Sequence, residues 1–520
     1  MSSGAGVVTT EVETARQQEE AGDATVRPIK LGKYPRLEFY SFMTLLSGLT
    51  TVDVLASDFV KAMSEMTHRG YIAESFGRAR ALLRWNYKIQ DAVRLVATTL
   101  PKSEFRQHLE RFSQAIAAGM RLSDFCRVES SKYMIQYDAE YSRIIDRLRQ
   151  VSETFSALLS AVSFLAVSMM ISSMTFGFGN PLTVLLSTGV AIGGVIFAML
   201  FLIRAYCPKE LSLFQGSHRP FNLDRFHAMN RPFLIAGVVV GLVLPGVLFA
   251  SSPFFFSNIQ YAIGVPMIVA GVPLYLFARV ARKRIRTISQ IEEQFPAFVK
   301  NFGDAFAITA SSRETLRVLK GSDYGALTGP ISSLYARLKA GIDSRLGWRL
   351  LAEESGSYMI QYHTDALLDA LTLGARAPLA SDAVFSSITA SQGRKKKREL
   401  VSSFLRATVV PLQITFAAVL TMVQAIVQIF SKIATLASTY LVLLTPIPQY
   451  LIVYYTYAVI ASTLFGTALG IAMVDGESEF DLTYNMGFQL LICGAIVGVA
   501  AIGASLLLGQ FNGVTAGVTL

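Results

Sequence analysis

The chain has 520 residues, of which 52% are hydrophobic and 16% charged, and its mean hydropathy is +0.43. A charged fraction well below the roughly 25% of soluble domains excludes an ordinary soluble protein and indicates an integral membrane protein with sizeable soluble parts. The net charge is +10. The cysteines Cys126, Cys207 and Cys493 are far apart and odd in number, which argues against a disulfide framework or a cysteine metal site, so we expect free buried thiols.

The two ends of the chain are expected to be tails. Residues 1–30 are rich in Ser, Gly, Thr, Gln and Glu, a composition that favours a disordered cytoplasmic tail. No basic segment followed by an apolar one occurs there, so no secretory signal is predicted and the N-terminus is expected to stay in the cytoplasm. Residues 510–520 are expected to form a C-terminal tail.

A helical cytoplasmic domain, called block one, is predicted for residues 31–154. Apolar side chains recur there at the spacing of one face of an amphipathic helix, at Phe105, Leu109, Phe112 and Ile116. The segment from Leu45 to Leu49 is expected to separate two helices. Because neither Gly nor Pro occurs from Met120 through Phe176, the last helix of block one is expected to continue into the membrane as a stalk.

A second helical cytoplasmic domain, called block two, is predicted for residues 280–406 and repeats features of block one. Its apolar stripe consists of Ile331, Leu334, Leu338 and Ile342. The pentapeptide Tyr133–Tyr137 recurs unchanged as Tyr358–Tyr362. The pair Ala118-Gly119 resembles Ala340-Gly341, and residues 38–43 resemble residues 294–299. We therefore interpret the chain as two copies of one unit, each a polar helical block followed by membrane spans.

Membrane spans are predicted wherever about 20 uncharged, mainly apolar residues follow one another. Four are expected in a membrane block at 155–279 and three in another at 407–509, near residues 155–176, 181–203, 233–252, 259–278, 407–430, 449–474 and 487–509. The short apolar stretch 433–446 leaves a total of eight or nine spans open.

Charge placement gives the expected orientation. Almost all Lys and Arg residues lie in the two blocks and in the basic connector 204–231, which the positive-inside rule places in the cytoplasm. Four spans then return the chain to the cytoplasm before block two. The sequence leaves open which side the acidic loop 475–481 faces. A multi-pass protein of the cytoplasmic membrane is predicted.

The motifs of common enzymes are missing. There is no phosphate-binding loop, no HExxH and no CxxC, so no catalytic residue, metal site or cofactor is predicted. The five histidines are scattered and are expected to be isolated surface residues. The predicted spans contain no Asp, Glu, Lys, Arg or His, unlike those of many transporters. Gln424 and Gln428 share a helix face and are expected to contact a neighbouring helix.

Two basic runs border the spans next to block two. They consist of Arg282, Lys283, Arg284 and Arg286, and of Arg394, Lys395, Lys396, Lys397 and Arg398. Five consecutive cations repel one another and are not expected in a core. The second run is interpreted either as an anchor on anionic lipid or as a docking surface for an acidic cytoplasmic partner. Nucleic-acid binding is not expected there, because aromatic residues do not alternate with the cations.

Each of the two helical blocks opens on an apolar or Phe-rich helix, closes on a Tyr-Met-Ile-Gln motif and is followed by membrane spans. This architecture resembles that of the archaeal type II secretion F-domain proteins. These are platform proteins of the FlaJ and TadC type, related to bacterial GspF and PilC. The resemblance covers residues 35–509 and is carried by architecture and degenerate motifs.

The resemblance implies an all-α, polytopic platform protein, without enzyme activity, of an archaellum or type IV pilus. It implies docking of a hexameric cytoplasmic secretion ATPase, with both basic runs as docking candidates, and coupling of the ATPase's motion to pilin-like subunits. A homodimer is expected. Neutralising residues 394–398 is expected to abolish assembly but not membrane insertion. The alternative is a transporter or channel built from two tandem parallel repeats.

Overall fold

The computed structural model describes residues 29–31, 35–50, 54–65, 70–175, 181–208, 221–239, 259–436, 449–476 and 480–518. All regular secondary structure in these ranges is helical, which confirms the all-α prediction. Residues 1–28 of the predicted tail and residues 209–220 of the basic connector lie outside them.

The chain divides into two compact units. Unit 1 comprises residues 1–140, 209–214 and 290–392, and unit 2 comprises residues 141–208, 215–289 and 393–520. Three long helices contribute residues to both units: α7 (Leu122–Thr175), α12 (Ile259–Thr309) and α17 (Ala377–Leu436). The uninterrupted course of α7 is the one predicted from the absence of Gly and Pro.

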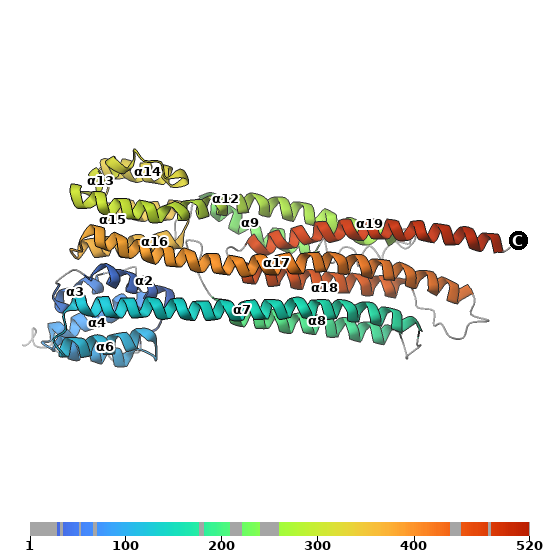
Figure 1. The fold of residues 1–520 in the computed structure, drawn as a ribbon, viewed down its shortest axis with the longest axis horizontal. Helices are drawn as coiled ribbons and strands as arrows, with labels where there is room; N and C mark the ends of the chain where they lie inside the picture. Colours follow the sequence, from blue (N-terminus) through green and yellow to red (C-terminus); the bar gives the residue numbers. More distant parts are fainter. Residues whose placement is uncertain are drawn as a thin grey trace, which may run out of the picture. The chain divides into compact units, whose positions relative to one another are not determined.

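Unit 1 joins the predicted blocks in one hydrophobic core. Its other helices are α2 (Pro35–Gly48), α3 (Ala56–Ser64), α4 (Gly70–Arg84), α5 (Ile89–Thr99), α6 (Glu104–Ala117), α13 (Ser312–Leu319), η3 (Gly325–Leu327), α14 (Thr328–Lys339), α15 (Ser344–Ser355) and α16 (Tyr358–Thr372). Phe42 and Phe105 from block one and Trp348 from block two belong to the same buried cluster. Helix α2 packs against α16, so the two blocks meet directly (Figure 1).

The predicted apolar stripes form helix faces, with one correction. Phe105, Leu109 and Phe112 are buried on α6, and Ile331, Leu334 and Leu338 are buried on α14. Ile342 lies beyond the end of α14 and is exposed. The helix ends before it because Gly341 adopts a φ of +83°, a left-handed conformation that terminates helices.

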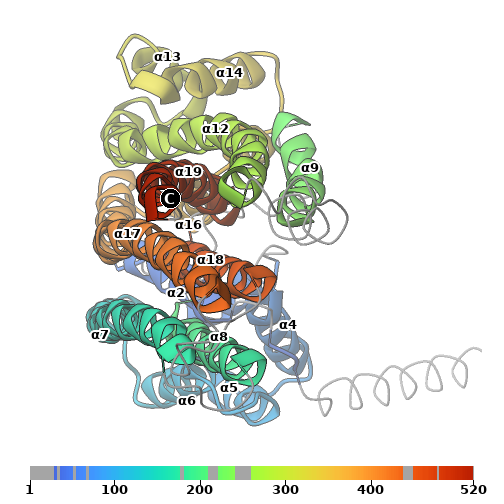
Figure 2. The ribbon, with the colours of Figure 1, turned by 90° about the vertical axis from the view of Figure 1, so that its right-hand side faces the viewer.

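Unit 2 is a bundle of long apolar helices. It contains α8 (Pro181–Tyr206), α9 (Phe221–Val238), α18 (Gln449–Asp475) and α19 (Phe480–Val518), with parts of α7, α12 and α17. Helix α18 packs against α8 and α19 (Figure 2). Small residues permit close packing of α19 on α12, since a Cβ atom added to Gly494 of α19 would lie 2.9 Å from the carbonyl oxygen of Gly264 on α12.

Six helices of the described residues are long and apolar enough to cross a membrane. They cover six of the seven predicted spans, namely all but the one at 233–252. Residues 240–252 of that span, and residues 437–446 of the ambiguous stretch 433–446, lie outside the described residues. Helix α19 continues to Val518, through most of the stretch predicted as a tail.

Candidate functional site

The two copies of the repeat share a helix ending upstream of the common pentapeptide. Gly119 after α6 and Gly341 after α14 have φ angles of +71° and +83°. In each copy the amide of the residue after the glycine donates to a carbonyl five residues back, Met120 to Ala115 and Ile342 to Arg337. This hydrogen bond pattern closes a helix with a left-handed glycine. The sequence resemblance of the two copies therefore reflects the same local backbone geometry.

In each copy an arginine–glutamate pair joins the helix that ends at the left-handed glycine to the helix that follows it. In block one, Arg111 Nε on α6 donates to Glu129 Oε1 on α7 at 2.8 Å. In block two, Arg337 Nη1 on α14 donates to Glu354 Oε2 on α15 at 3.3 Å. The pentapeptides are placed differently, because Tyr133 lies within α7, whereas Gly356 ends α15 and Tyr358 starts α16.

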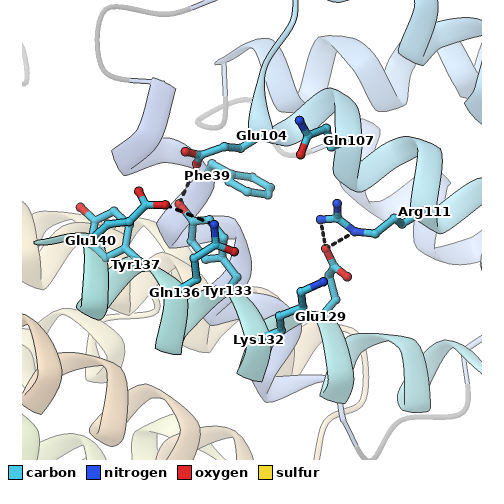
Figure 3. A pocket seen from close by; sticks show the side chains of 10 residues that line it. All are labelled: Phe39, Glu104, Gln107, Arg111, Glu129, Lys132, Tyr133, Gln136, Tyr137 and Glu140. Atoms are coloured by element: carbon cyan, nitrogen blue, oxygen red, sulfur yellow. Dashed lines mark hydrogen bonds and ion pairs between the residues drawn. The ribbon is translucent and has the colours of Figure 1, made fainter.

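A polar groove lies over the first copy of the motif. Its volume is about 160 Å³, and it is lined by Phe39, Glu104, Gln107, Arg111, Glu129, Lys132, Tyr133, Gln136, Tyr137 and Glu140 (Figure 3). Tyr133 donates to Glu104 Oε2 at 3.3 Å, and Gln136 donates to Glu140 Oε1 at 3.2 Å. The lining presents carboxylates and amides, groups that can bind the hydrogen bond donors of a partner.

Burial shifts the pKa values of several groups beside this groove. Burial lowers the pKa of His108, although the nearby Glu129 carboxylate opposes that shift. Burial alone would raise the pKa of Glu129, but hydrogen bonds and charge from His108 and Arg111 lower it to about 2. Burial, reinforced by Glu104, raises the pKa of Tyr133 above its usual range. Glu129 is therefore a carboxylate at neutral pH.

The two pentapeptides meet at Tyr40 of α2, which the sequence did not single out. The ring centroid of Tyr40 lies 4.9 Å from that of Tyr137 and 6.5 Å from that of Tyr362, and these two residues are equivalent in the repeat. Ser387 of α17 donates to the Tyr40 hydroxyl at 3.0 Å and lies 3.2 Å from Nε2 of His363. Unit 1 is thus joined internally by a buried polar junction between its two blocks.

The expectation of isolated surface histidines is wrong for the two histidines whose side chains the structure describes. His108 and His363 are both buried, and His363 Nδ1 lies 2.9 Å from the Met359 carbonyl oxygen. The spacing of the histidines along the sequence does not indicate whether they are buried, because the residues that bury them come from other helices.

The predicted docking residues fall into buried and exposed groups. Arg394 and Arg398 are 6% and 7% exposed, so the expectation that this basic run stays out of a core is wrong at these two positions. They lie four residues apart and share one face of α17. Arg282 is half-buried, and Lys395 Nζ lies 3.1 Å from Ser289 Oγ. The exposed members are Lys283, Arg284, Arg286, Lys396 and Lys397.

Two half-buried arginines of unit 2 pair with buried acids that the sequence placed in an acidic loop. Asp475 at the end of α18 accepts hydrogen bonds from Arg282 and Arg406. Asp481 at the start of α19 accepts one from Arg282. The only signal in the sequence was their position between two spans, which does not reveal partners on distant helices.

Polar residues within the spans pair across helices, although the following pairs are not formed by Gln424 and Gln428, for which the contact was predicted. Gln413 Nε2 on α17 donates to Thr463 Oγ1 on α18 at 3.0 Å, and Thr467 of α18 donates to Gln489 of α19 at 2.7 Å. Gln424 is buried on α17 and Gln428 lies on the same helix. Cys126 and Cys493 are buried free thiols, whereas Cys207 is only half-buried.

Comparison with known proteins tests the resemblance. Flagella accessory protein J of Methanocaldococcus jannaschii is 29% identical over 377 residues, which are 70% of this chain and 65% of the relative. The protein of the same name from Methanococcus voltae is 24% identical over 349 residues, 65% of this chain and 61% of the relative. The chain is a homologue of these archaeal proteins. The predicted resemblance to the archaeal F-domain proteins is thereby confirmed.

The match covers only part of each relative. The chain spans less than two thirds of the length of either relative. No family model matches the chain, and no solved structure matches it. Together with six apolar helices, the Flagella accessory protein J homologues identify an integral membrane protein.

Proposed function

We propose that this protein is the membrane platform of an archaeal type IV filament machine, an archaellum or a pilus, and acts as an assembly component rather than an enzyme. The similarity to two proteins named Flagella accessory protein J carries the proposal and favours the archaellum. The architecture supports it, because an all-helical unit built from two repeats is covalently continuous with a bundle of apolar helices.

Within this proposal, a hexameric cytoplasmic secretion ATPase docks on exposed cations of α12 and α17 that belong to unit 2, a few residues along the chain from the segments of these helices that belong to unit 1. The exposed cations Lys283, Arg284 and Arg286 on α12 and Lys396 and Lys397 on α17 are the docking residues, since exposed charge guides association with an acidic partner. Arg282, Arg394 and Arg398 support that surface from within unit 2. Lys395 contributes through its contact with Ser289. Anionic lipid headgroups compete for the same cations.

The transmission elements are the helices α7, α12 and α17. Each is a single helix with residues in both units, so a displacement of unit 1 reaches the membrane helices without crossing a loop. Through them the ATPase's motion acts on pilin-like subunits in the membrane. The protein lies in the cytoplasmic membrane with its N-terminus in the cytoplasm, functions as a homodimer and uses no cofactor or nucleic acid.

The test is a gentle detergent pull-down of the tagged full chain from native membranes, followed by mass spectrometry. Recovery of a secretion ATPase with pilin-like or archaellin subunits is expected, and the identity of those subunits separates archaellum from pilus. A transport ATPase subunit or a soluble binding protein in their place would favour the transporter alternative. Substrate-dependent flux in proteoliposomes would then be measured, and its presence would reject the platform role.

A further inference from the structure

A cluster of four charged side chains is enclosed within unit 2 where α18 ends and α19 begins. Asp475 Oδ2 accepts from Arg406 Nη2 at 2.6 Å and from Arg282 Nη2 at 3.2 Å. Ser402 Oγ donates to Asp475 Oδ1 at 2.9 Å. Asp475 is 7% exposed, so its charge is held by these three donors rather than by water.

The second acid completes the cluster and balances its charge. Asp481 is 1% exposed and lies 3.2 Å from Arg282 Nη2. The guanidinium group of Arg282 also lies over the ring of Tyr484, 4.1 Å from its centroid. Two arginines therefore face two aspartates, and Arg282 contacts an acid at the end of α18 and another at the start of α19. We call Asp475, Asp481, Arg282, Arg406 and Ser402 the Asp475 clamp.

Asp475 stands at the C-terminus of α18, where a negative charge is electrostatically unfavourable, and the clamp offsets this cost. A negative side chain at a helix C-terminus is unfavourable, because the carbonyl groups there already carry partial negative charge. Arg398 relieves this by donating to the carbonyl oxygens of Val474 and Met473 at 2.9 and 3.2 Å. The end of α18 is therefore held by cations from α12 and α17, not by its own helix.

The helices that supply these cations, α12 and α17, are the two that run from the part of block two in unit 1 into unit 2. Arg282 lies on α12, whose residues from 290 belong to unit 1. Arg406 and Ser402 lie on α17, whose residues up to 392 belong to unit 1. Asp475 is thus bonded to both helices that carry block two, within a few turns of the points where they enter unit 2.

We infer that Asp475 is a positioning residue that fixes the α18–α19 hairpin to α12 and α17 together, so that a displacement of block two moves this hairpin with it. The inference deepens the proposed function and rests on it. It assigns the C-terminal hairpin as the membrane element that block two drives. The clamp acts on the register of the hairpin against both helices, in addition to the close packing of α19 on α12.

The test separates positioning from simple stabilisation by comparing two variants of the full chain in cells lacking the native copy. Asp475→Asn leaves two arginines facing one aspartate, and such an unbalanced buried charge is expected to lower the amount of folded protein. Asp475→Asn combined with Arg406→Gln keeps the remaining Arg282–Asp481 pair balanced, so folding is expected to recover. The matched control is Arg149→Gln with Glu153→Gln, which neutralises an exposed ion pair of α7 in unit 2.

Three quantities are measured for each variant: protein in the membrane, ATPase captured and filaments per cell. For the double variant we expect the amount of protein in the membrane and the amount of captured ATPase to stay within about twofold of wild type, and the number of filaments per cell to fall at least tenfold. The control variant should match wild type in all three quantities. Filament output at the wild-type level from the folded double variant overturns the inference. Absence of ATPase capture by the wild-type protein would instead reject the proposed function.

A structural measurement tests the clamp independently of the ATPase. Spin labels are attached at Leu400→Cys on α17 and Phe465→Cys on α18, two exposed positions, in a Cys207→Ser background. The distance distribution between the labels is expected to be narrow in the otherwise wild-type protein and broader in the double variant. An equally narrow distribution in both proteins would show that the clamp does not set the register, and would overturn the inference even if filaments are lost.

Discussion

The hydroxyl groups of Thr44 and Ser387 lie 2.9 Å apart although 343 residues separate them in the chain. Thr44 belongs to α2 of block one and Ser387 to the segment of α17 within unit 1. Both side chains are buried, and each hydroxyl has a further partner, because Thr44 also lies within hydrogen-bond distance of the Tyr40 carbonyl oxygen and Ser387 of the Tyr40 hydroxyl. This contact makes the two repeats one cooperative unit rather than two tethered domains.

Replacing the serine of this junction should weaken unit 1. Ser387→Ala removes one partner each from Thr44, the Tyr40 hydroxyl and His363 Nε2, and loss of a hydrogen bond typically costs about 0.5–1.5 kcal/mol. Thr44 and the Tyr40 hydroxyl keep their bonds to the backbone carbonyls of Tyr40 and Ser387. We expect a lower melting temperature of the purified protein in detergent. The control is Ser386→Ala, since the exposed Ser386 bonds only to the Ala383 carbonyl of its own helix. Equal melting temperatures for the two variants would contradict the role of the junction.

Unit 1 is expected to lose stability in acid, through His108 and Glu129. The folded state lowers the pKa of His108 below the 6.5 of an unfolded chain, so its contribution is complete above pH 6.5 and is lost as the pH falls below that value. Glu129, with a folded pKa of about 2 against 4.5, adds stability above pH 4.5 that is lost between pH 4.5 and 2.

These two contributions can be separated by substitution. His108→Gln should flatten the fall in melting temperature between pH 7 and 5. Glu129→Gln should flatten the part below pH 4.5 but not the part between pH 7 and 5, because it removes the carboxylate that opposes the lowering of the His108 pKa. Glu110→Gln, which removes an exposed partner of Arg106, is the control and should leave the profile unchanged. A wild-type melting temperature that rises on acidification from pH 7 to 5 would refute the assignment of His108.

Much of the fold follows from local sequence signals. The apolar stripes at Phe105 and Ile331 and the lack of Gly and Pro after Met120 predict helix faces and the continuous α7, because these signals act within one helix. The repeated pentapeptide predicts a duplicated unit. These features are set by neighbouring residues and need no knowledge of distant contacts.

The buried polar groups could not be predicted in the same way. In the sequence, Asp475 belongs to an acidic loop, and Arg398 belongs to a basic run whose cations repel one another. Each is buried because a partner on another helix neutralises its charge or accepts its hydrogen bonds. Tyr40 likewise becomes central only when Tyr137 and Tyr362 are brought to it by packing.

Close helix packing in unit 2 should depend on individual glycines. Gly494→Val places side-chain atoms against the carbonyl oxygen of Gly264 and against Met267, and overpacking of this kind typically costs about 1–3 kcal/mol. We expect a lower melting temperature and less monodisperse protein in detergent. Gly503→Ala on the same helix serves as the control, since a Cβ atom there meets nothing within 4 Å. Retention of the wild-type melting temperature by the valine variant would argue against direct α12–α19 contact.

The exposed cations beside the spans should govern ATPase capture without contributing to folding. Lys396→Gln with Lys397→Gln removes two exposed charges of α17, and we expect about tenfold weaker capture of the ATPase, since loss of about 1.4 kcal/mol lowers affinity by that factor. Membrane level and melting temperature should not change. Added salt should reduce the difference between variant and wild type, because screening weakens exposed charges first.

Two further variants test whether the ATPase recognises these cations in particular rather than net charge. Lys88→Gln with Lys102→Gln removes the same charge from exposed positions of block one and should leave capture intact. Arg394→Gln, at a buried position, should instead lower the melting temperature, because Arg394 lies over Tyr141 within unit 2. If the Lys88 and Lys102 variant lost capture as strongly as the Lys396 and Lys397 variant, net charge rather than this surface would be what the ATPase recognises.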